Sequence, residues 1–387
     1  MSDSGWNIST NIPNQVNQLY RKDTETMDKN KIAVLGGGHG AHAMAADLKS
    51  RGFTVNMYEM PQFKDNLNQL FTTKTITVKG AINGQYTIDK VTSDIEEAIE
   101  GVRYIAVVTP AFAHKGYAKL LKGKVSKDQI VIIYPGSFGG LLFKNIFGSE
   151  SCPIIAETNT LPYDTRMSGP CQSTVHGFNN TNIAFMPSEM GAELFAEVQK
   201  VHTFVKMYKD ILEAGLSSVN PTVHSGLCLF SINDIENWPK RPFFLYEHGV
   251  TRSSVKLDLV LENERKMLGE KFGYELTALN DLLGLNKEYT WQDLYKGIHG
   301  NISLTPISGP HDIFNRYFTE DVPYGFVPWS YLGKLVGVET KYMDIIVNLY
   351  NVIHDRDWWK EGRNINDLGL EGMDVQQIKK YLLTGHK

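Results

Sequence analysis

Cysteine is scarce in this sequence, and its few cysteines are not arranged in pairs. The 387 residues include three, Cys152, Cys171 and Cys228, and no Cys-x-x-Cys motif occurs. An odd number of cysteines without this motif argues against a disulfide framework and against a thiolate zinc site. Reduced thiols in an intracellular protein are the simplest interpretation.

Long apolar segments and clusters of basic residues are also missing. No apolar run approaches the ~18 residues that a membrane helix needs. The N-terminus lacks the basic and apolar regions of a secretory signal. Lys and Arg number 39 and Asp and Glu number 43, so the net charge is −4, which provides no overall attraction to nucleic acid or to an anionic membrane. We therefore expect a soluble, cytoplasmic protein without a nucleic-acid or membrane partner.

The residues that are present have the composition of a globular protein with a large core. Hydrophobic residues make up 42% of the chain and charged residues 21%. At roughly 100–200 residues per domain, the length predicts two or three domains. Residues 1–30 are polar and show no clear period, so we interpret them as an N-terminal extension.

The first organised segment, which begins at Lys31, has the pattern of an α/β domain. An apolar run at residues 32–35 ends in a glycine-rich turn, and it is followed by helix-forming residues at 41–51 and a second apolar run at 53–58. Further helical segments alternate with apolar runs of strand length at 102–108, 129–134 and 153–156. Strands without polar alternation predict a mostly parallel sheet covered by helices on both faces.

Two strand pairs and a long helix complete this interpretation of the first domain. Residues 75–78 and 85–88 predict a hairpin inserted in the sheet, and residues 173–176 and 182–186 predict a last strand pair. Apolar residues at helical spacing predict a helix over residues 198–212.

The remainder of the chain is expected to be helical. Apolar residues at helical spacing predict helices at 257–272, 275–283, 291–298, 313–318, 341–354 and 375–382. We therefore predict an α/β domain at residues 31–205, followed by an all-α domain at residues 206–387.

The glycine-rich turn after the first strand matches a phosphate-binding fingerprint. Gly36-x-Gly38-x-x-Ala41 fits the pattern G-x-G-x-x-G/A, and it lies between a predicted strand and a predicted helix. Gly36 permits the tight turn, Gly38 lets a pyrophosphate approach the backbone, and Ala41 allows close packing. The helix N-terminus offers free N–H groups to the anion. We assign cofactor binding to these three residues and to His39 and Gly40 between them.

Glu59, at the end of the second predicted strand, indicates which dinucleotide binds. An acidic side chain in this place accepts the ribose hydroxyls of the adenosine and repels a 2′-phosphate. The next residues, 60–62, include no arginine that could receive such a phosphate. We therefore predict NAD as the cofactor, with NADH preferred over NADPH. The alternative is a chance glutamate beside the glycine turn of an unrelated α/β fold.

Two loops that follow predicted strands should lie beside the reacting end of the cofactor, because ligands bind beyond the carboxyl ends of parallel strands. The first contains Thr109, Pro110 and Ala111, which we assign to cofactor binding. The second contains Ser137, for which a contact with a carboxylate or phosphate and a plain turn are both open.

Three residues of the helical half have the chemistry of a catalytic site. His224 lies in a segment with Pro221 and Gly226, just beyond the predicted domain boundary, and ligand sites favour such interdomain clefts. Asp321 could orient an imidazole, and Arg316 could bind a carboxylate through two hydrogen bonds. A capping histidine and an ion pair that holds a loop are the structural alternatives.

These segments resemble those of a known family. Gly36-Gly37-Gly38-His39-Gly40-Ala41-His42 resembles the cofactor motif Gly-x-Gly-Asn-Gly-Ala-His of the octopine/nopaline, or opine, dehydrogenases. Asn220-Pro221-x-x-His224 resembles their catalytic-histidine segment, and residues 316–325 resemble their second signature. Similar segments lie, in the family's order, at residues 108–114, 157–163 and 244–251, so that the resemblance covers roughly residues 31–340.

The resemblance implies an N-terminal Rossmann domain, an all-helical C-terminal domain and a specific reaction. The family condenses an amino acid reductively with an α-keto acid, often pyruvate, through an imine, and it uses NAD(P)H. By position, the family's catalytic histidine corresponds to His224, and its arginine and aspartate partners correspond to Arg316 and Asp321. The expected product is an N-(carboxyalkyl)amino acid, and the reverse reaction is expected as well.

The chain departs from the family pattern in two places. His39 replaces the usual asparagine of the turn, and Asp164-Thr165 stands where arginine-using members have a cysteine. Thr165 is therefore a candidate substrate contact, and arginine is in doubt as the amino substrate. Glu157 is a further candidate, which could meet a cationic part of an amino substrate or end a strand.

Other interpretations remain open. A hydroxy-acid or polyol-phosphate dehydrogenase has the same two-domain plan, although no lysine stands in a comparable context, and a non-catalytic NAD sensor could retain the fold. The sequence contains no His-Glu-x-x-His or similar cluster, so we predict no metal site. Trp238, Tyr246 and Trp291 are expected in the core. A monomer and a homodimer are both compatible with the sequence.

Overall fold

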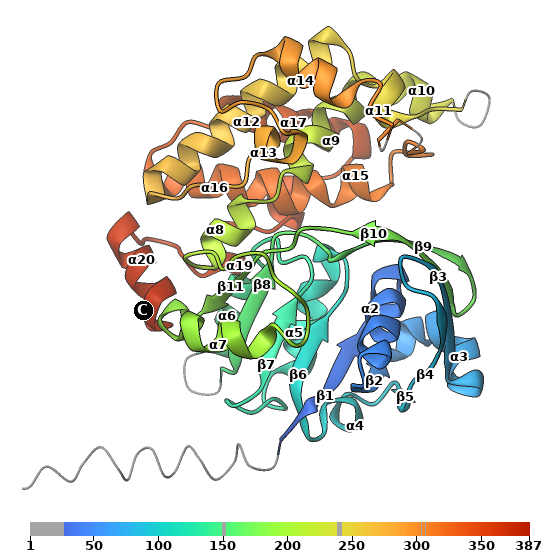
Figure 1. Cartoon of the computed structure of the whole chain (residues 1–387). Coiled ribbons are helices and arrows are strands. Elements are labelled where there is room, and N and C mark those ends of the chain that lie inside the picture. Colours follow the sequence, from blue (N-terminus) through green and yellow to red (C-terminus); the bar gives the residue numbers. More distant parts are fainter. Residues whose placement is uncertain (1–26, 149–151, 238–241, 303, 306) are drawn as a thin grey trace, which may run out of the picture.

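The computed structural model describes residues 27–148, 152–237, 242–302, 304–305 and 307–387, and it arranges them in two halves (Figure 1). The first half, coloured blue to green, contains all the strands, and the second, yellow to red, is helical. This arrangement confirms the predicted fold class. Within these ranges, no helix is both long and apolar enough to cross a membrane.

The main sheet has seven strands in the order β11-β8-β7-β6-β1-β2-β5. All neighbouring pairs are parallel except the first, in which β11 runs antiparallel to β8. In sheet order, the strands are β11 (Ile183–Met186), β8 (Ile154–Thr158), β7 (Ile130–Ile133), β6 (Val102–Val107), β1 (Asp28–Leu35), β2 (Thr54–Tyr58) and β5 (Lys90–Thr92). The parallel sheet is therefore confirmed. Residues 1–26, most of the predicted extension, lie outside the described residues.

Helices cover the sheet on both faces, which explains why its strands have no polar alternation. In β1, Ile32 and Val34 belong to one apolar cluster and Ala33 and Leu35 to another, on the opposite face. The helix α2 (His39–Ser50) packs in the first cluster. Residues from three helices pack in the second: α4 (Ile95–Ile99), α5 (His114–Leu121) and α6 (Gly139–Phe147).

A second, four-stranded sheet corrects two predictions. Its order is β4-β3-β10-β9, formed by β4 (Gly84–Thr87), β3 (Thr75–Gly80), β10 (Gln172–Phe178) and β9 (Tyr163–Gly169). The predicted hairpin exists, but it pairs with β10 and is not inserted in the main sheet. The predicted last strand pair is wrong, because β10 pairs with β9 and β3 while β11 pairs with β8. The second sheet covers α2 on the side away from the main sheet (Figure 1).

The predicted helix over residues 198–212 is also wrong. The helix α7 (Gly191–Val198) ends where it should begin, and α8 (Ile211–Leu216) starts only after Asp210, whose carboxylate caps it. Between them the backbone runs beside β11, so that Tyr208 N–H donates to Ile183 O at 2.9 Å. Val201, Phe204 and Tyr208 are buried by this segment without forming a helix, whereas Val205 is 62% exposed.

The second half is built around α12 (Arg252–Phe272), which packs against α9 (Asn220–Phe230), α14, α16 and α17. The predicted helices 291–298 and 341–354 are confirmed as α14 (Trp291–Ile298) and α17 (Lys341–His354). Two others are shorter than predicted, α13 (Leu279–Leu283) and α15 (Arg316–Thr319). The remaining elements are α10 (Ile232–Glu236), α11 (Leu245–His248), the π-helix η4 (Val322–Phe326), α16 (Val327–Val336) and α18 (Trp358–Glu361).

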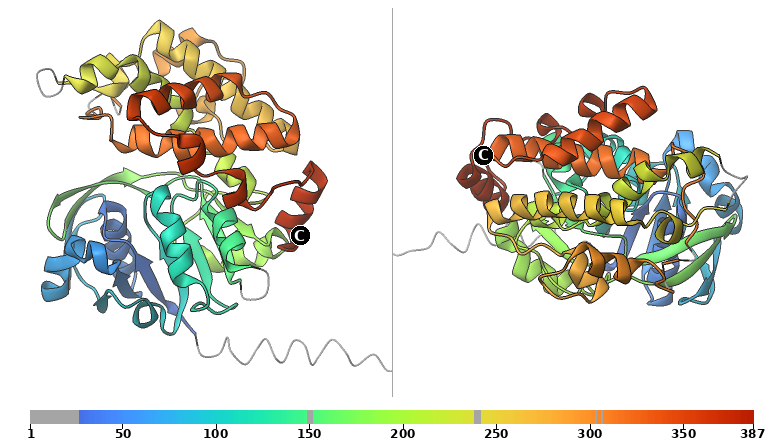
Figure 2. Two further views of the ribbon diagram at one scale, coloured as in Figure 1. Left: turned by 180° about the vertical axis from the view of Figure 1, so that it is seen from behind. Right: turned by 90° about the horizontal axis from the view of Figure 1, so that it is seen from above.

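The end of the chain returns to the first half. The helix α19 (Ile365–Leu368) lies against α6, and α20 (Val375–Thr384) lies against β11 and η3 (Ser188–Met190). Figure 2 shows both helices beside the α/β half in the view from behind. Lys115 and Asp367 form an ion pair at 2.7 Å across this contact. The two halves are thus connected by chain segments at both ends of the helical half.

Candidate active site

The turn between β1 and α2 has the space that a dinucleotide pyrophosphate requires. Gly36 has φ +122°, and a Cβ there would lie 2.5 Å from the carbonyl oxygen of Val108, so only glycine fits. A Cβ on Gly38 would meet nothing within 4 Å, which leaves the space beside the helix N-terminus open. The fingerprint therefore fits the group that the sequence predicts there.

His39 and Glu59 border this turn from two sides. Burial, assisted by the charge of Arg316, lowers the pKa of His39 to about 4, so its imidazole is neutral near pH 7. Glu59 is 5% exposed and accepts hydrogen bonds from Met60 N at 2.8 Å and from Tyr117 Oη at 3.0 Å. Its other oxygen has one weaker donor, the side chain of Asn66 at 3.2 Å, and thus retains capacity for a ribose hydroxyl.

The loop after β6 contacts the helical half directly. Ala111 N–H, in the short helix η2 (Ala111–Ala113), donates to Glu320 Oε1 at 2.8 Å. Glu320 Oε2 accepts from Arg316 Nε at 2.5 Å. A single carboxylate thus joins the loop assigned to the cofactor and the guanidinium assigned to the substrate. Thr109 and Pro110 precede Ala111 in the same loop, and the hydroxyl of Thr109 is buried.

His224 and Asp321 are brought together although they lie 97 residues apart in the sequence. His224 is in the second turn of α9, and Asp321 is the residue before the π-helix η4. The distance from His224 Nδ1 to Asp321 Oδ2 is 2.7 Å, and the two side chains are 8% and 14% exposed. This is the geometry of a carboxylate that orients an imidazole. Tyr317 stacks on the imidazole with 4.1 Å between ring centroids.

Arg316 and Asp321 do not pair with each other, which argues against the alternative that the two residues form an ion pair that holds a loop. Arg316 pairs with Glu320, and 52% of its side chain remains exposed, so its outer nitrogens can bind an anion. Because Arg316 affects the pKa of His39, its charge also faces the glycine turn.

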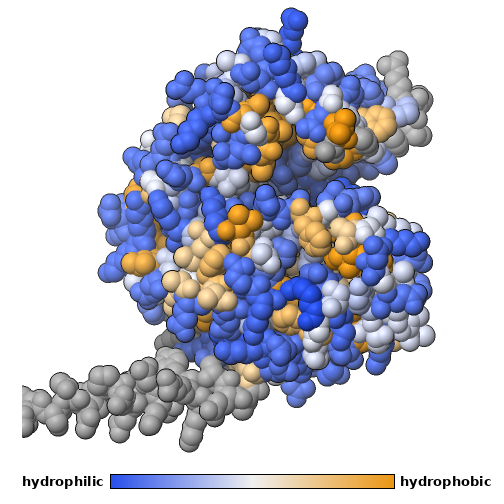
Figure 3. Space-filling model, in the orientation of Figure 1, coloured by the Kyte–Doolittle hydropathy of each residue, from blue (hydrophilic) through white to orange (hydrophobic). Residues whose placement is uncertain are grey.

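Arg316, Glu320 and Asp321 line a pocket between the two halves, whereas His224 is not among its lining residues. Figure 3 shows a groove between the two halves on one face of the molecule. The α/β half contributes the residues that follow β7 and β8, and the helical half contributes the acidic and basic side chains. The lining residues are Pro135, Ser137, Asn159, Gly215, Ser218, Asn220, Pro221, Arg316, Glu320, Asp321, Tyr324, Gly325 and Trp329.

Of the three further substrate candidates, the structure places one at the pocket and two away from it. Ser137 lines the pocket. Glu157 is fully buried, and its carboxylate accepts from the N–H groups of Phe138 and Gly140 at 3.3 and 2.7 Å; burial raises its pKa to about 7. The hydroxyl of Thr165 is buried between β9 and β10, where it donates to Thr174 O at 3.0 Å. Both residues therefore have structural contacts and do not line the pocket.

Three residues of the site were not anticipated from the sequence. Tyr246, expected in the core, places its hydroxyl 2.7 Å from His224 Nε2. Glu320 bridges the halves as described above. Arg363 is buried and donates to Ala111 O at 3.0 Å and to Ser137 O, with Tyr324 under its guanidinium. Tyr246 and Glu320 lie in segments that resemble the family, whereas Arg363 lies beyond them and had no sequence signal.

Three further predictions concern metal binding, disulfide bonds and two tryptophans. Among the described residues, no three His, Cys, Asp or Glu side chains are grouped so that they could hold a metal ion. The three cysteines are unpaired. Trp291 packs against the core of the helical half, and Trp238 lies outside the described residues.

Comparisons with known proteins agree with this arrangement. Residues 207–354 match the model for the α-helical domain of NAD/NADP octopine/nopaline dehydrogenase, and residues 31–141 match that for the N-terminus of NAD-dependent glycerol-3-phosphate dehydrogenase. An opine dehydrogenase of Arthrobacter sp. (strain 1C) is 28% identical over 91% of this chain and 99% of its own.

Solved structures have the same fold. Octopine dehydrogenase with NADH and L-arginine superimposes with a TM-score of 0.72 at 20% identity, over 92% of this chain and 98% of that one. Yersinopine dehydrogenase with NADP+ gives 0.67 at 16% identity, over 93% and 98%. The chain is therefore similar over 91% of its length to the octopine/nopaline (opine) dehydrogenases, NAD(P)-dependent oxidoreductases that act on CH–NH donors.

Proposed function

We propose that this enzyme uses NADH to condense an amino acid reductively with an α-keto acid, pyruvate, and that it also catalyses the reverse reaction. The observation that supports this proposal best is the hydrogen bond between His224 and Asp321, 2.7 Å long, beside a pocket that Arg316 also lines. Imine formation between the amine of an amino acid and the carbonyl of a keto acid needs a group that moves protons near neutral pH, and a guanidinium can hold a substrate carboxylate during the reaction.

The proposed reaction begins with addition of the amine to the keto carbonyl, which forms a carbinolamine. Loss of water then forms an imine, and reduction of the imine yields an N-(carboxyalkyl)amino acid. NADH supplies the hydride for this reduction when it is bound. Gly36, Gly38, His39, Gly40 and Ala41 would hold its pyrophosphate.

The side chains of the helical half would move protons and orient the substrate. Asp321 accepts from Nδ1 of His224 and so fixes the tautomer in which Nε2 exchanges protons. Arg316 would bind a substrate carboxylate, and Glu320 would orient Arg316 relative to the loop after β6. Thr109, Pro110 and Ala111 of that loop would face the nicotinamide, since ligands bind beyond the carboxyl ends of parallel strands.

For the cofactor, we propose a preference for NADH that depends on Glu59. Because its carboxylate borders the glycine turn, a 2′-phosphate would meet a like charge, and we expect NADPH to bind at least ~10-fold more weakly, which is ~1.4 kcal/mol. Glu59→Ala should weaken NADH binding and reduce this difference, whereas Glu100→Ala at a distant turn should change neither. Dissociation constants measured by NADH and NADPH fluorescence test this, and tighter binding of NADPH to the wild-type protein would contradict it.

The test of the proposed function is NADH oxidation with pyruvate, measured with and without each member of a panel of amino acids. We expect oxidation only when an amino acid is present, and the responding amino acid identifies the substrate. Oxidation with the keto acid alone would instead indicate a hydroxy-acid dehydrogenase. Tight NADH binding without turnover of any keto acid and amino acid pair would indicate a sensor.

A further inference from the structure

Both ring nitrogens of His224 already have hydrogen-bond partners. Nδ1 lies 2.7 Å from Asp321 Oδ2, and Nε2 lies 2.7 Å from the hydroxyl oxygen of Tyr246. An acid/base must exchange its proton with the reacting atoms either directly or through one intervening group. The only hydrogen-bonded path from Nε2 that the structure describes leads through the hydroxyl of Tyr246.

The surroundings of the imidazole favour this path. The side chain of His224 is 8% exposed, and Tyr317 is stacked on its ring with 4.1 Å between centroids. Tyr246, from the short helix α11, is tilted against the imidazole and is only partly buried. As a whole residue, Tyr246 is therefore more exposed than His224. Burial raises the pKa of Tyr246 well above its usual range, so the hydroxyl keeps its proton.

We propose that Tyr246 is a catalytic residue that relays protons between His224 and the substrate; this inference rests on the function proposed above. In the dehydration step, the imidazolium of His224 gives its Nε2 proton to Tyr246 Oη, and the phenol proton passes to the carbinolamine oxygen. A new O–H bond forms, the C–O bond breaks, and its electron pair leaves with water. The lone pair of the nitrogen completes the iminium ion. The phenol ends as it began, and the imidazole is neutral again.

The alternative is that Tyr246 occupies the position of the substrate in the resting enzyme and is displaced when the substrate binds. The two possibilities predict opposite effects of removing the hydroxyl. A relay loses its proton path, so kcat falls. If the hydroxyl of Tyr246 only occupies the position of the substrate, its removal leaves Nε2 of His224 free, so kcat stays the same or rises.

The test compares Tyr246→Phe with Tyr350→Phe. The hydroxyl of Tyr350 is also buried in the helical half and donates to the carbonyl oxygen of Ser225, next to His224, at 2.9 Å. Both variants thus lose one tyrosine hydroxyl beside α9, and only one of these hydroxyls contacts the imidazole. We expect Tyr246→Phe to lower kcat by ~100-fold, the lower range for acid–base catalysis, with little change in KM for the amino acid. Tyr350→Phe should retain the kcat of the wild type.

Two further measurements separate a relay from a structural role. The dissociation constant of NADH should be the same in the wild type and in both variants, and the solvent deuterium isotope effect on kcat should change only in Tyr246→Phe. Undiminished kcat in Tyr246→Phe, in an enzyme whose wild type requires the amino acid, would overturn the relay alone. A wild-type enzyme without amine-dependent turnover would overturn the proposed function and the relay together.

Discussion

We expect His224→Ala to lower kcat by at least ~100-fold, because the variant lacks the imidazole that would supply and accept the protons of the carbinolamine and amine steps. The imidazole is oriented by Asp321 at 2.7 Å, so its loss removes an acid/base that is already in position. NADH binding should stay intact, since the glycine turn and Glu59 belong to the other half of the molecule. Steady-state kinetics with the responding amino acid, together with NADH fluorescence titration, measure both quantities.

A suitable control is His299→Ala, which removes an imidazole at the end of α14, where it lies 3.7 Å from Glu247. This variant should keep its kcat. If His224→Ala loses only a small part of its kcat, or loses NADH affinity instead, His224 is not the acid/base. Asp321→Asn should lower kcat as well, because an amide cannot stabilise the imidazolium charge.

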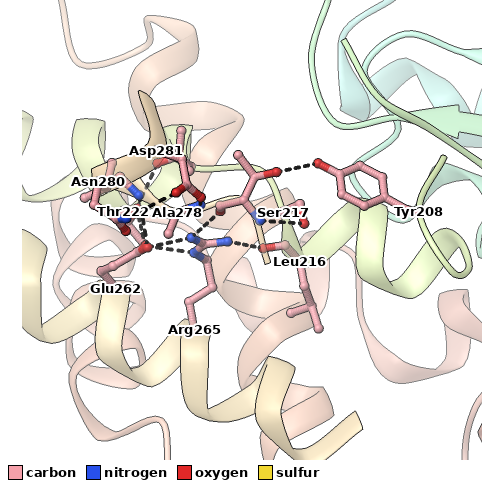
Figure 4. Close-up of polar contacts among 12 residues, drawn as sticks. Tyr208, Leu216, Ser217, Thr222, Glu262, Arg265, Ala278, Asn280 and Asp281 are labelled. Atoms are coloured by element: carbon pink, nitrogen blue, oxygen red, sulfur yellow. Dashed lines mark hydrogen bonds and ion pairs between the residues drawn. The ribbon is translucent and has the colours of Figure 1, made fainter. Parts of the chain in front are cut away.

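Arg265→Leu is expected to lower the free energy of unfolding by ~3–5 kcal/mol, because it leaves the carboxylate of Glu262 buried without its cation. Both side chains are fully buried, and two guanidinium nitrogens lie 2.6 and 2.8 Å from the two carboxylate oxygens. Arg265 also donates to Leu216 O at 2.5 Å and to Thr277 O at 2.8 Å. Figure 4 shows how these contacts connect α12 to the segments before α9 and α13.

This network also reaches α9, the helix that contains His224. Glu262 accepts a hydrogen bond from the hydroxyl of Thr222 at 3.4 Å, and Thr222 lies two residues before His224 in α9. Denaturant unfolding at equilibrium measures the loss of stability. Lys360→Ala, which breaks the exposed ion pair with Asp357, is the control and should leave the unfolding midpoint unchanged. An Arg265→Leu variant as stable as the wild type would show that the buried pair makes no net contribution.

The local elements of the fold followed from sequence periodicity. The predicted helices 291–298 and 341–354 agree with α14 and α17 at both ends. In α4 and α14, a side chain before the first residue, Asp94 or Thr290, accepts hydrogen bonds from the first turn. Such signals lie within a few residues of the element, so the tertiary structure has little opportunity to override them.

The pairing of the strands could not be predicted from sequence periodicity. Val78 in β3 pairs with Ser173 in β10, which lies almost a hundred positions later, and nothing near either residue specifies the other. The strand β9 was missed because most of its side chains are exposed and its sequence has no apolar run. Residues 198–212 have apolar residues at helical spacing, yet contact with β11 holds much of this segment extended. Long-range contacts decide both the pairing of these strands and the conformation of this segment.

The residues of the candidate site also fall into those that the sequence could nominate and those that it could not. Residue type, turn context and family resemblance were enough to nominate the glycine turn, Glu59, His224, Arg316 and Asp321. They could not show that Glu157 and Thr165 satisfy backbone and hydroxyl groups inside the α/β half. Nor could they distinguish Tyr246 from an ordinary core tyrosine, because its importance depends on a 2.7 Å contact with a residue of another helix.

By itself, the sequence determined the division into an α/β half and a helical half, and it nominated the glycine turn and the family resemblance, because each depends on short patterns whose chemistry is local. The tertiary structure alone decided which side chains meet. In it, Asp321 pairs with His224 and Glu320 pairs with Arg316, and the end of the chain packs against the first half. Hydrogen bonds form between neighbours in space, and the packing of distant helices and strands is what makes these residues neighbours.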